Sequence, residues 1–406
     1  MIVLFPPAAA IVAALLASTL NWLALIPWRR SRGAHWAERA RRSYPARVAA
    51  ACNVWLLPAN AFVLAMMLHP ADRFLAPATG LLAWIGALLG TWPLNREIMP
   101  PLGFGAWLRL ALVGAGLRLA GWLVLIGAVV TMPDTFGWRT AAMTTVVVLV
   151  FLWLLWGGGL RVLRWLRLLV PADARLQGIV ADKAGRMNVN VRAVWELKIP
   201  LGYAAALPTT RELLFSQRLL ELHPDGEIAA ICAHELGHLT ESKLVLAGRV
   251  LTSFTLVPWI LLTPSLHAFG PASLAGIAGL SLLLMALAQR LGRRMETRAD
   301  RLAAQHQAGD GTYAQALARL YETNQMPAVM PGKRKIHPHL YDRLLAAGVT
   351  PDYPRPKPPA RLGWSTVLLM VSLGALLGLD LAKPHDEEPY LPTPTVEPSS
   401  SAKTGL

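Results

Sequence analysis

Two histidines and a glutamate at residues 233–240 have the types and spacing of a metal-dependent hydrolytic site. The segment reads Ala-His-Glu-Leu-Gly-His-Leu-Thr, so His234 and His238 are four residues apart. On a helix, residues four apart project from one face, which lets two imidazoles bind one zinc ion. Glu235 can reach a water molecule bound to that ion, and zinc lowers the pKa of this water. The motif therefore predicts a zinc-activated water with Glu235 as its general base.

A catalytic zinc needs a third protein ligand and an open position for water. Glu296 is the candidate, in the stretch Met-Glu-Thr-Arg-Ala-Asp at residues 295–300. Asp300 lies four residues later on the same face, so we expect it to orient a histidine ligand. Spacing alone leaves an ordinary solvated helix equally open. Two apolar runs between the motifs favour the ligand, because a membrane hairpin returns the chain to the same side.

The chain around these motifs is strongly apolar. Of its 406 residues, 54% are hydrophobic and 16% are charged, and the mean hydropathy is +0.42. A soluble domain carries about 25% charged residues, and about 20 apolar residues cross a bilayer. About eight runs are candidate spans, and they lie near residues 3–28, 48–69, 74–94, 108–131, 140–159, 246–264, 270–289 and 362–382. The third run contains Pro77 and several glycines, so a re-entrant segment is its alternative.

The net charge of +15 is concentrated at the ends of the apolar runs. Basic residues favour the cytoplasmic side of a membrane, so the pattern indicates orientation rather than nucleic-acid binding. It predicts that the N-terminus and the C-terminal tail lie outside. It also places residues 171–245 and 290–361, and hence the catalytic site, in the cytoplasm.

These features predict a mainly α, polytopic membrane protein with a small α+β, zincin-like cytoplasmic catalytic domain. In that domain, residues 187–194 alternate apolar and polar side chains, as a strand does, and Glu212–Ser216 is a second strand candidate. The predicted boundaries are an N-terminal membrane domain at 1–170, a metallopeptidase domain at 171–361 with its membrane hairpin at 246–289, a span at 362–382 and a disordered tail at 383–406.

The two motifs, separated by a membrane hairpin, resemble the peptidase family of the HtpX heat-shock protease and the CAAX prenyl endopeptidases. The resemblance covers roughly residues 171–345. It implies one zinc ion per chain, bound by His234, His238 and Glu296. The five leading spans are not explained by it.

The same resemblance implies a role for a His-Pro pair followed by an arginine. Here the stretch 337–343 reads His-Pro-His-Leu-Tyr-Asp-Arg. By similarity, His337 would contact the substrate or the oxyanion, and His339 is a less certain alternative. Arg343 would support the acidic residue near the metal.

A substrate strand is implied as well. Family members often carry Asn-Ala-Phe-Ala on an edge strand above the metal, and the corresponding stretch here, residues 200–206, lacks the asparagine. A peptide can still pair with the backbone of Gly202, Tyr203 and Ala204 by strand addition. Any role that the asparagine side chain plays in the family is not available here, and we therefore expect the substrate preference to differ.

The sequence therefore predicts a zinc metalloendopeptidase of a bacterial inner membrane that hydrolyses membrane proteins or peptides. One alternative is a sensor-transducer that uses a proteolytic domain for signalling, for which a defined cleaved partner would be decisive. Another is a non-enzymatic transporter or channel with a chance motif, which would lack stoichiometric zinc. An intramembrane protease ranks lower, because the motif precedes a span and is followed by Glu241 and Lys243.

Overall fold

The computed structural model describes residues 4–72, 74–99, 102–332 and 338–382. Most of these residues are helical, and a small sheet lies between residues 169 and 216. The predicted fold class, a polytopic helical protein with a small catalytic unit, is confirmed. The tail at 383–406, expected to be disordered, lies outside the described residues.

The helices before the sheet follow the predicted apolar runs. They are α1 (Phe5–Ala24), α2 (Ile26–Arg29), α3 (Trp36–Leu68), α4 (Leu75–Leu89), α5 (Trp92–Ile98), α6 (Phe104–Thr131), α7 (Trp138–Trp153) and α8 (Gly159–Trp165). The break between α4 and α5 coincides with Pro93, whose missing N–H suits the start of a new helix.

By length and hydropathy, six helical stretches of the described chain could cross a membrane. They are Phe5–Arg29, Trp36–Leu68, Leu75–Ile98, Phe104–Thr131, Trp138–Trp165 and Ala272–Gln305. A seventh candidate is a pair bent by 44°, formed by α12 (Lys243–Ser253) and the stretch Val257–Phe269. The run predicted near 362–382 forms α17 (Trp364–Leu381), which is apolar but shorter than the six.

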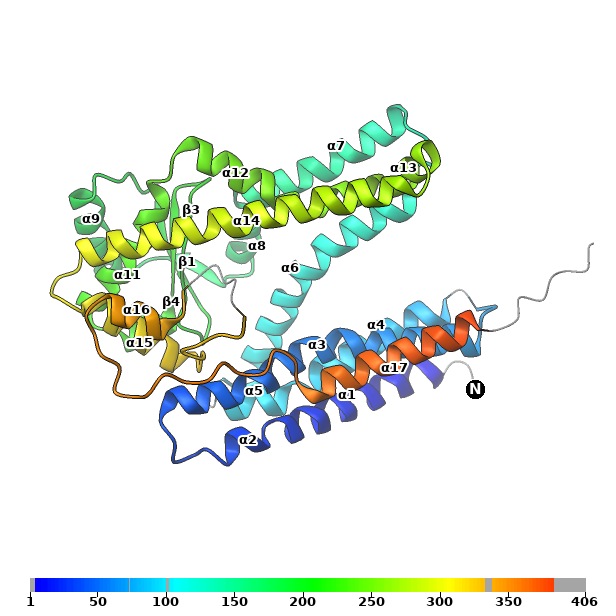
Figure 1. Cartoon of the computed structure of the whole chain (residues 1–406), viewed down its shortest axis with the longest axis horizontal. Helices are drawn as coiled ribbons and strands as arrows, with labels where there is room; N and C mark the ends of the chain where they lie inside the picture. The colour runs from blue at the N-terminus through cyan, green and yellow to red at the C-terminus, as the bar shows by residue number, and fades with distance from the viewer. Residues whose placement is uncertain (1–3, 73, 100–101, 333–337, 383–406) are drawn as a thin grey trace, which may run out of the picture.

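The membrane helices form two groups that diverge from the catalytic unit (Figure 1). In the first group, α1, α3, α4 and α17 pack through small side chains such as Ala13, Ala17 and Ala83. Gly86 of α4 lies against α1 so closely that a Cβ there would come within 2.0 Å of the carbonyl oxygen of Ala10. Small residues allow this approach of two helix backbones in a membrane.

The second group joins α6 and α7 to the hairpin that follows the motif. Leu125 and Val147, from α6 and α7, share one buried cluster with Val257 and Ile260 of the hairpin. The first arm of the hairpin ends with α13 (Leu262–Phe269). The second arm is α14 (Ala272–Gln305), which runs the whole length of this group back to the catalytic unit (Figure 1).

The sheet has four short strands in the order β1-β2-β4-β3. They are β1 (Leu169–Pro171), β2 (Ala193–Leu197), β3 (Ala204–Leu207) and β4 (Glu212–Ser216). Strands β2 and β4 are parallel, whereas β1 pairs with β2, and β3 with β4, in antiparallel fashion. Consequently β3 is an edge strand, and one of its sides is open to a further strand.

Of the two strands predicted from the sequence, one is confirmed and the other is wrong. Glu212–Ser216 is β4, as predicted. The prediction for residues 187–194 is wrong over most of its length, because β2 begins only at Ala193. Met187 ends the helix α9 (Ala174–Arg186), and Asn188 adopts a left-handed φ of 51°. Val189 is apolar because it enters the core from this turn.

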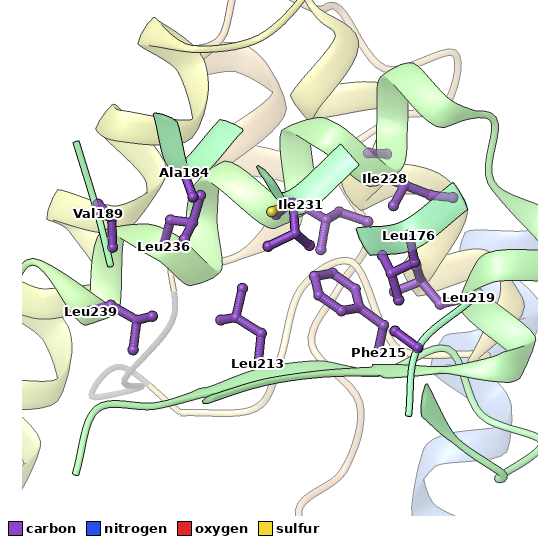
Figure 2. Close-up of a cluster of buried hydrophobic side chains, with 14 residues drawn as sticks. Leu176, Ala184, Val189, Leu213, Phe215, Leu219, Ile228, Ile231, Leu236 and Leu239 are labelled. Carbon is purple, nitrogen blue, oxygen red and sulfur yellow. The ribbon is translucent and has the colours of Figure 1, made fainter. Parts of the chain in front are cut away.

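The core of the catalytic unit lies between the sheet and two helices, α9 and α11 (Asp225–Leu239) (Figure 2). Phe215 and Leu213 of β4 point toward Ile231 and Leu236 of α11, and all four side chains are buried. This apolar face fixes α11 on the sheet and leaves its other face for the two histidines.

Candidate metal centre

The helix α11 places His234 and His238 side by side. It begins after Pro224, and Asp225 and Glu227 in its first turn favour the positive end of the helix dipole. The two imidazole rings lie with centroids 5.1 Å apart, and both residues are buried. The i, i+4 geometry predicted from the sequence is therefore present.

Glu296 reaches these histidines from α14. One carboxylate oxygen lies 3.4 Å from Nε2 of His234 and the other lies 3.6 Å from Nε2 of His238. One donor atom from each of the three residues lies within 4.8 Å of the others. Two imidazole nitrogens and one carboxylate are a donor set typical of catalytic zinc sites, so these residues fit that ion.

Close contact between α11 and α14 makes this convergence possible. A Cβ at Gly237, between the two histidines, would lie 3.1 Å from Cα of Ala299 on α14. The glycine of the motif thus lets the later helix approach the first. Arg298 of α14 also donates hydrogen bonds to the carbonyl oxygens of Gly237 and Thr240, which end α11.

A cluster of polar groups contacts Nδ1 of His234, the ring nitrogen that faces away from Glu296. Nδ1 lies 3.1 Å from Asp300 and 2.7 Å from the hydroxyl of Tyr313, on α15 (Thr312–Thr323). That hydroxyl donates to Asp300 over 2.8 Å, and Arg343 of α16 (Leu340–Ala346) donates to both Asp300 and Tyr313. The predicted pairing of Asp300 with a histidine, and of Arg343 with Asp300, is thus seen in the geometry.

Electrostatics in this cluster favour a fixed arrangement. Burial disfavours the imidazolium form of His234, but hydrogen bonds to Asp300 and Glu296 outweigh it and raise its pKa to about 9. Burial holds the pKa of Tyr313 well above its usual value, so its hydroxyl stays protonated and able to donate. Asp300 therefore accepts hydrogen bonds while His234 keeps one ring orientation.

The far nitrogen of His238 has an equivalent partner that sequence reasoning missed. Nδ1 lies 3.0 Å from Glu241, whose side chain is only 3% exposed. Arg249 of α12 in turn pairs with Glu241 at 3.1 Å. The only available signal was the three-residue spacing from His238 to Glu241. Tyr313 gave no signal, because its role depends on how α15 packs.

Glu235 lies beside the metal ligands at the wall of a pocket. The pocket has a volume of about 380 Å³ and is lined by Glu235 and His234, by the stretch 201–204 leading into β3, and by Arg47 of α3. Gly202, Tyr203 and Ala204, predicted to bind substrate, therefore border the same space as the predicted general base. A peptide in this pocket would meet both.

The remaining site prediction, His337, lies outside the described residues. His339, its alternative, directly precedes α16, and its Nδ1 accepts a hydrogen bond from the backbone N–H of Met330 over 3.2 Å. That contact gives His339 a structural position at the start of the helix that carries Arg343.

The catalytic unit resembles known peptidases. Residues 172–349 match the model of peptidase family M48. This family consists of zinc metallopeptidases, and the matched segment contains the two histidines, Glu296, Asp300 and Arg343. No curated protein matches the chain. The M48 match supports a metallopeptidase with a His-His-Glu metal site, and it ends before α17 and excludes all helices before the sheet.

Proposed function

We propose that this protein is a zinc metalloendopeptidase that hydrolyses peptide bonds of membrane-associated proteins or peptides. The observation that carries the proposal is the meeting of His234, His238 and Glu296 beside Glu235, in a pocket bordered by an edge strand. A zinc ion bound there would polarise the scissile carbonyl and lower the pKa of a water molecule.

The residues of the chain divide the rest of the chemistry among them. Glu235 can accept the proton of the attacking water and then deliver it to the leaving amine, since its buried carboxylate faces the same pocket. Asp300 and Glu241 keep the two imidazoles oriented, each through the ring nitrogen that faces away from Glu296. His337 is proposed to contact the substrate on the basis of the family resemblance alone.

Substrate binding is proposed to use the open side of β3. Extended peptides add to exposed sheet edges through main-chain hydrogen bonds, which tolerate many sequences. Ala204 of β3 lines the pocket with Glu235 and His234, so a peptide paired with β3 would pass the metal centre.

The distribution of basic residues supports a cytoplasmic site in a bacterial inner membrane, with both chain termini outside. The pocket includes Arg47, at the point where α3 changes from a basic stretch to an apolar one. A substrate segment leaving the bilayer would therefore reach the pocket directly. Membrane proteins and peptides at this boundary are the proposed substrates.

The proposal is tested by comparing zinc content and cleavage of an unfolded membrane protein in wild type, Glu235→Gln and Glu296→Ala. We expect Glu235→Gln to retain zinc and to lose activity by about 10²- to 10⁴-fold. Glu296→Ala should lose both zinc and activity. Glu221→Gln, an exposed carboxylate on α10 (Gln217–Leu222), is the matched control and should behave as wild type. Equal cleavage by the wild type and both site variants would refute the enzyme assignment.

A further inference from the structure

In the main chain that leads into β3, the N–H and C=O groups of successive residues point alternately toward β4 and toward the open side of the sheet. The carbonyl of Tyr203 accepts from the N–H of Ser216 over 2.7 Å, and the N–H of Tyr203 donates to the Ser216 hydroxyl over 2.8 Å. Tyr203 and, two residues on, Ala205 thus face β4. Gly202, Ala204 and Ala206 consequently face the open side, where a substrate strand would pair.

The open side is already occupied at Gly202. The N–H of Gly202 donates to Oδ1 of Asn324 over 2.9 Å, and Nδ2 of Asn324 donates to the carbonyl of Gly202 over 2.6 Å. These are the two hydrogen bonds that a residue of an added strand would make. Within the described chain, no such contact engages the outward main-chain groups of Ala204 or Ala206.

Asn324 is in turn hydrogen-bonded by a residue of the N-terminal helix group. It follows the last residue of α15, where the carbonyls of the final turn lack helical partners. Nη1 of Arg47, from α3, donates to the carbonyl of Asn324 over 2.8 Å and to that of Gln325 over 3.1 Å. Both Arg47 and Asn324 also line the pocket that contains Glu235.

We propose that Asn324 is a positioning residue that closes the Gly202 end of the substrate-pairing edge, and that Arg47 holds it there. A bound peptide then pairs through Ala204 and Ala206 and extends only past Ala206. In the antiparallel arrangement, the carboxyl side of the peptide lies toward Gly202, so the closed end limits that side. This inference rests on the proposed function and adds a register to it.

The N-terminal helices gain a role from this arrangement. α3 has 33 residues, or about 50 Å, whereas about 30 Å spans the hydrocarbon core. Its first part lies against the catalytic unit, where Ala37 shares a buried cluster with Tyr313 and Tyr321 of α15. The membrane group thereby forms part of the wall that sets the substrate register.

A ladder of peptides tests the proposal on the full-length, zinc-loaded protein in detergent. The peptides share one cleavable sequence and are lengthened one residue at a time at either end. Their affinities are measured by fluorescence polarisation on the Glu235→Gln protein, and kcat and KM are measured on the protein with Glu235. With Asn324 present, extension at the amino end should tighten binding, whereas extension at the carboxyl end should soon stop doing so.

Removing the closure should open the second end. In Asn324→Ala, carboxyl-end extension should tighten binding by about tenfold, because two further main-chain hydrogen bonds become available, and the cleavage position should become less uniform. Arg47→Met should show the same change to a smaller extent, and Arg47→Lys, which can still donate to the carbonyls, should resemble wild type. Asn190→Ala, an exposed asparagine outside the pocket, is the matched control.

Three results would overturn the inference. They are equal gains at both ends in the protein with Asn324, an unchanged ladder in both Asn324→Ala and Arg47→Met, and a complete lack of peptide binding. The proposed function fails separately: an asymmetric binding ladder without any cleavage would keep the closed edge and remove the peptidase. Cleavage together with equal gains in affinity from extension at either end would keep the peptidase assignment and remove the closed edge.

Discussion

Each of the two histidines offers one ring nitrogen to the metal position and the other to a carboxylate that an arginine contacts. His234 has Asp300 and Arg343 behind it, and His238 has Glu241 and Arg249. A carboxylate on the far nitrogen fixes the tautomer and raises the basicity of the ligand nitrogen. Each arginine donates a hydrogen bond to its carboxylate and so helps to hold it in place.

Loss of either carboxylate should weaken zinc binding. We expect Asp300→Asn and Glu241→Gln each to lower zinc affinity by about 10- to 100-fold, measured by competition with a chelator. Glu221→Gln serves again as the exposed control. Unchanged affinity in Glu241→Gln would show that Glu241 has no part in orienting His238.

Tyr313→Phe should have a smaller effect of the same sign. The variant removes the hydroxyl that joins His234, Asp300 and Arg343 but leaves the direct contact between His234 and Asp300. We expect zinc affinity to fall less than in Asp300→Asn in the same chelator titration. A loss larger than that of Asp300→Asn would contradict this order of importance.

Residue spacing predicted some of these side chains and not others. The histidines follow from i, i+4 geometry within one helix, and Glu296 follows from a hairpin that returns α14 to the motif. Tyr313 and Asn324 could not be found in this way, because each acts across a tertiary contact that the local sequence does not encode. The strand prediction for residues 187–194 was wrong for a different reason. Val189 is buried in the core from a turn, and its apolar side chain gave the segment the alternating pattern of a strand.

At the scale of elements, the crossing of α11 and α14 decides whether a third ligand reaches the histidines. Gly237 has its Cβ position 3.1 Å from Cα of Ala299, which is tighter than normal contact. Gly237→Ala should push α14 outward, destabilise the protein by about 1–3 kcal/mol and weaken zinc binding. Thermal unfolding and chelator competition measure the two effects.

The control for this change is another glycine in a helix. A Cβ at Gly178 of α9 meets nothing within 4 Å, so Gly178→Ala should stabilise by about 0.4–1 kcal/mol and leave zinc binding unchanged. Tight zinc binding by Gly237→Ala would show that the metal centre tolerates a wider helix crossing than the structure indicates.

At the scale of the molecule, the helix group formed by α1, α3, α4 and α17 depends on close backbone approach. A Cβ at Gly86 would lie 2.0 Å from a backbone oxygen of α1, whereas one at Gly80 on the same helix would have its nearest neighbours, in Phe62 and Pro58, at ordinary contact distances of 3.4 Å or more. Gly86→Ala should therefore lower the unfolding temperature in detergent and Gly80→Ala should not. Equal unfolding temperatures would argue against this packing of α1 on α4.

The orientation predicted from basic residues belongs to the same scale. Asp134, between α6 and α7, is predicted outside, and Asp182 on α9 is predicted in the cytoplasm; both are exposed. With Cys52 replaced by alanine, a cysteine at position 134 should react with an impermeant maleimide on intact cells. A cysteine at position 182 should react only after lysis, and the reverse pattern would invert the proposed topology.

One zinc ion is proposed to be bound by His234, His238 and Glu296. Zinc K-edge absorption of the purified full-length protein tests it most directly. We predict one zinc per chain with two imidazole nitrogens at about 2.0–2.1 Å and oxygen donors at about 2.0–2.2 Å, and loss of the bound zinc in Glu296→Ala. Purified protein without bound zinc, or a zinc environment that Glu296→Ala leaves unchanged, would contradict the account.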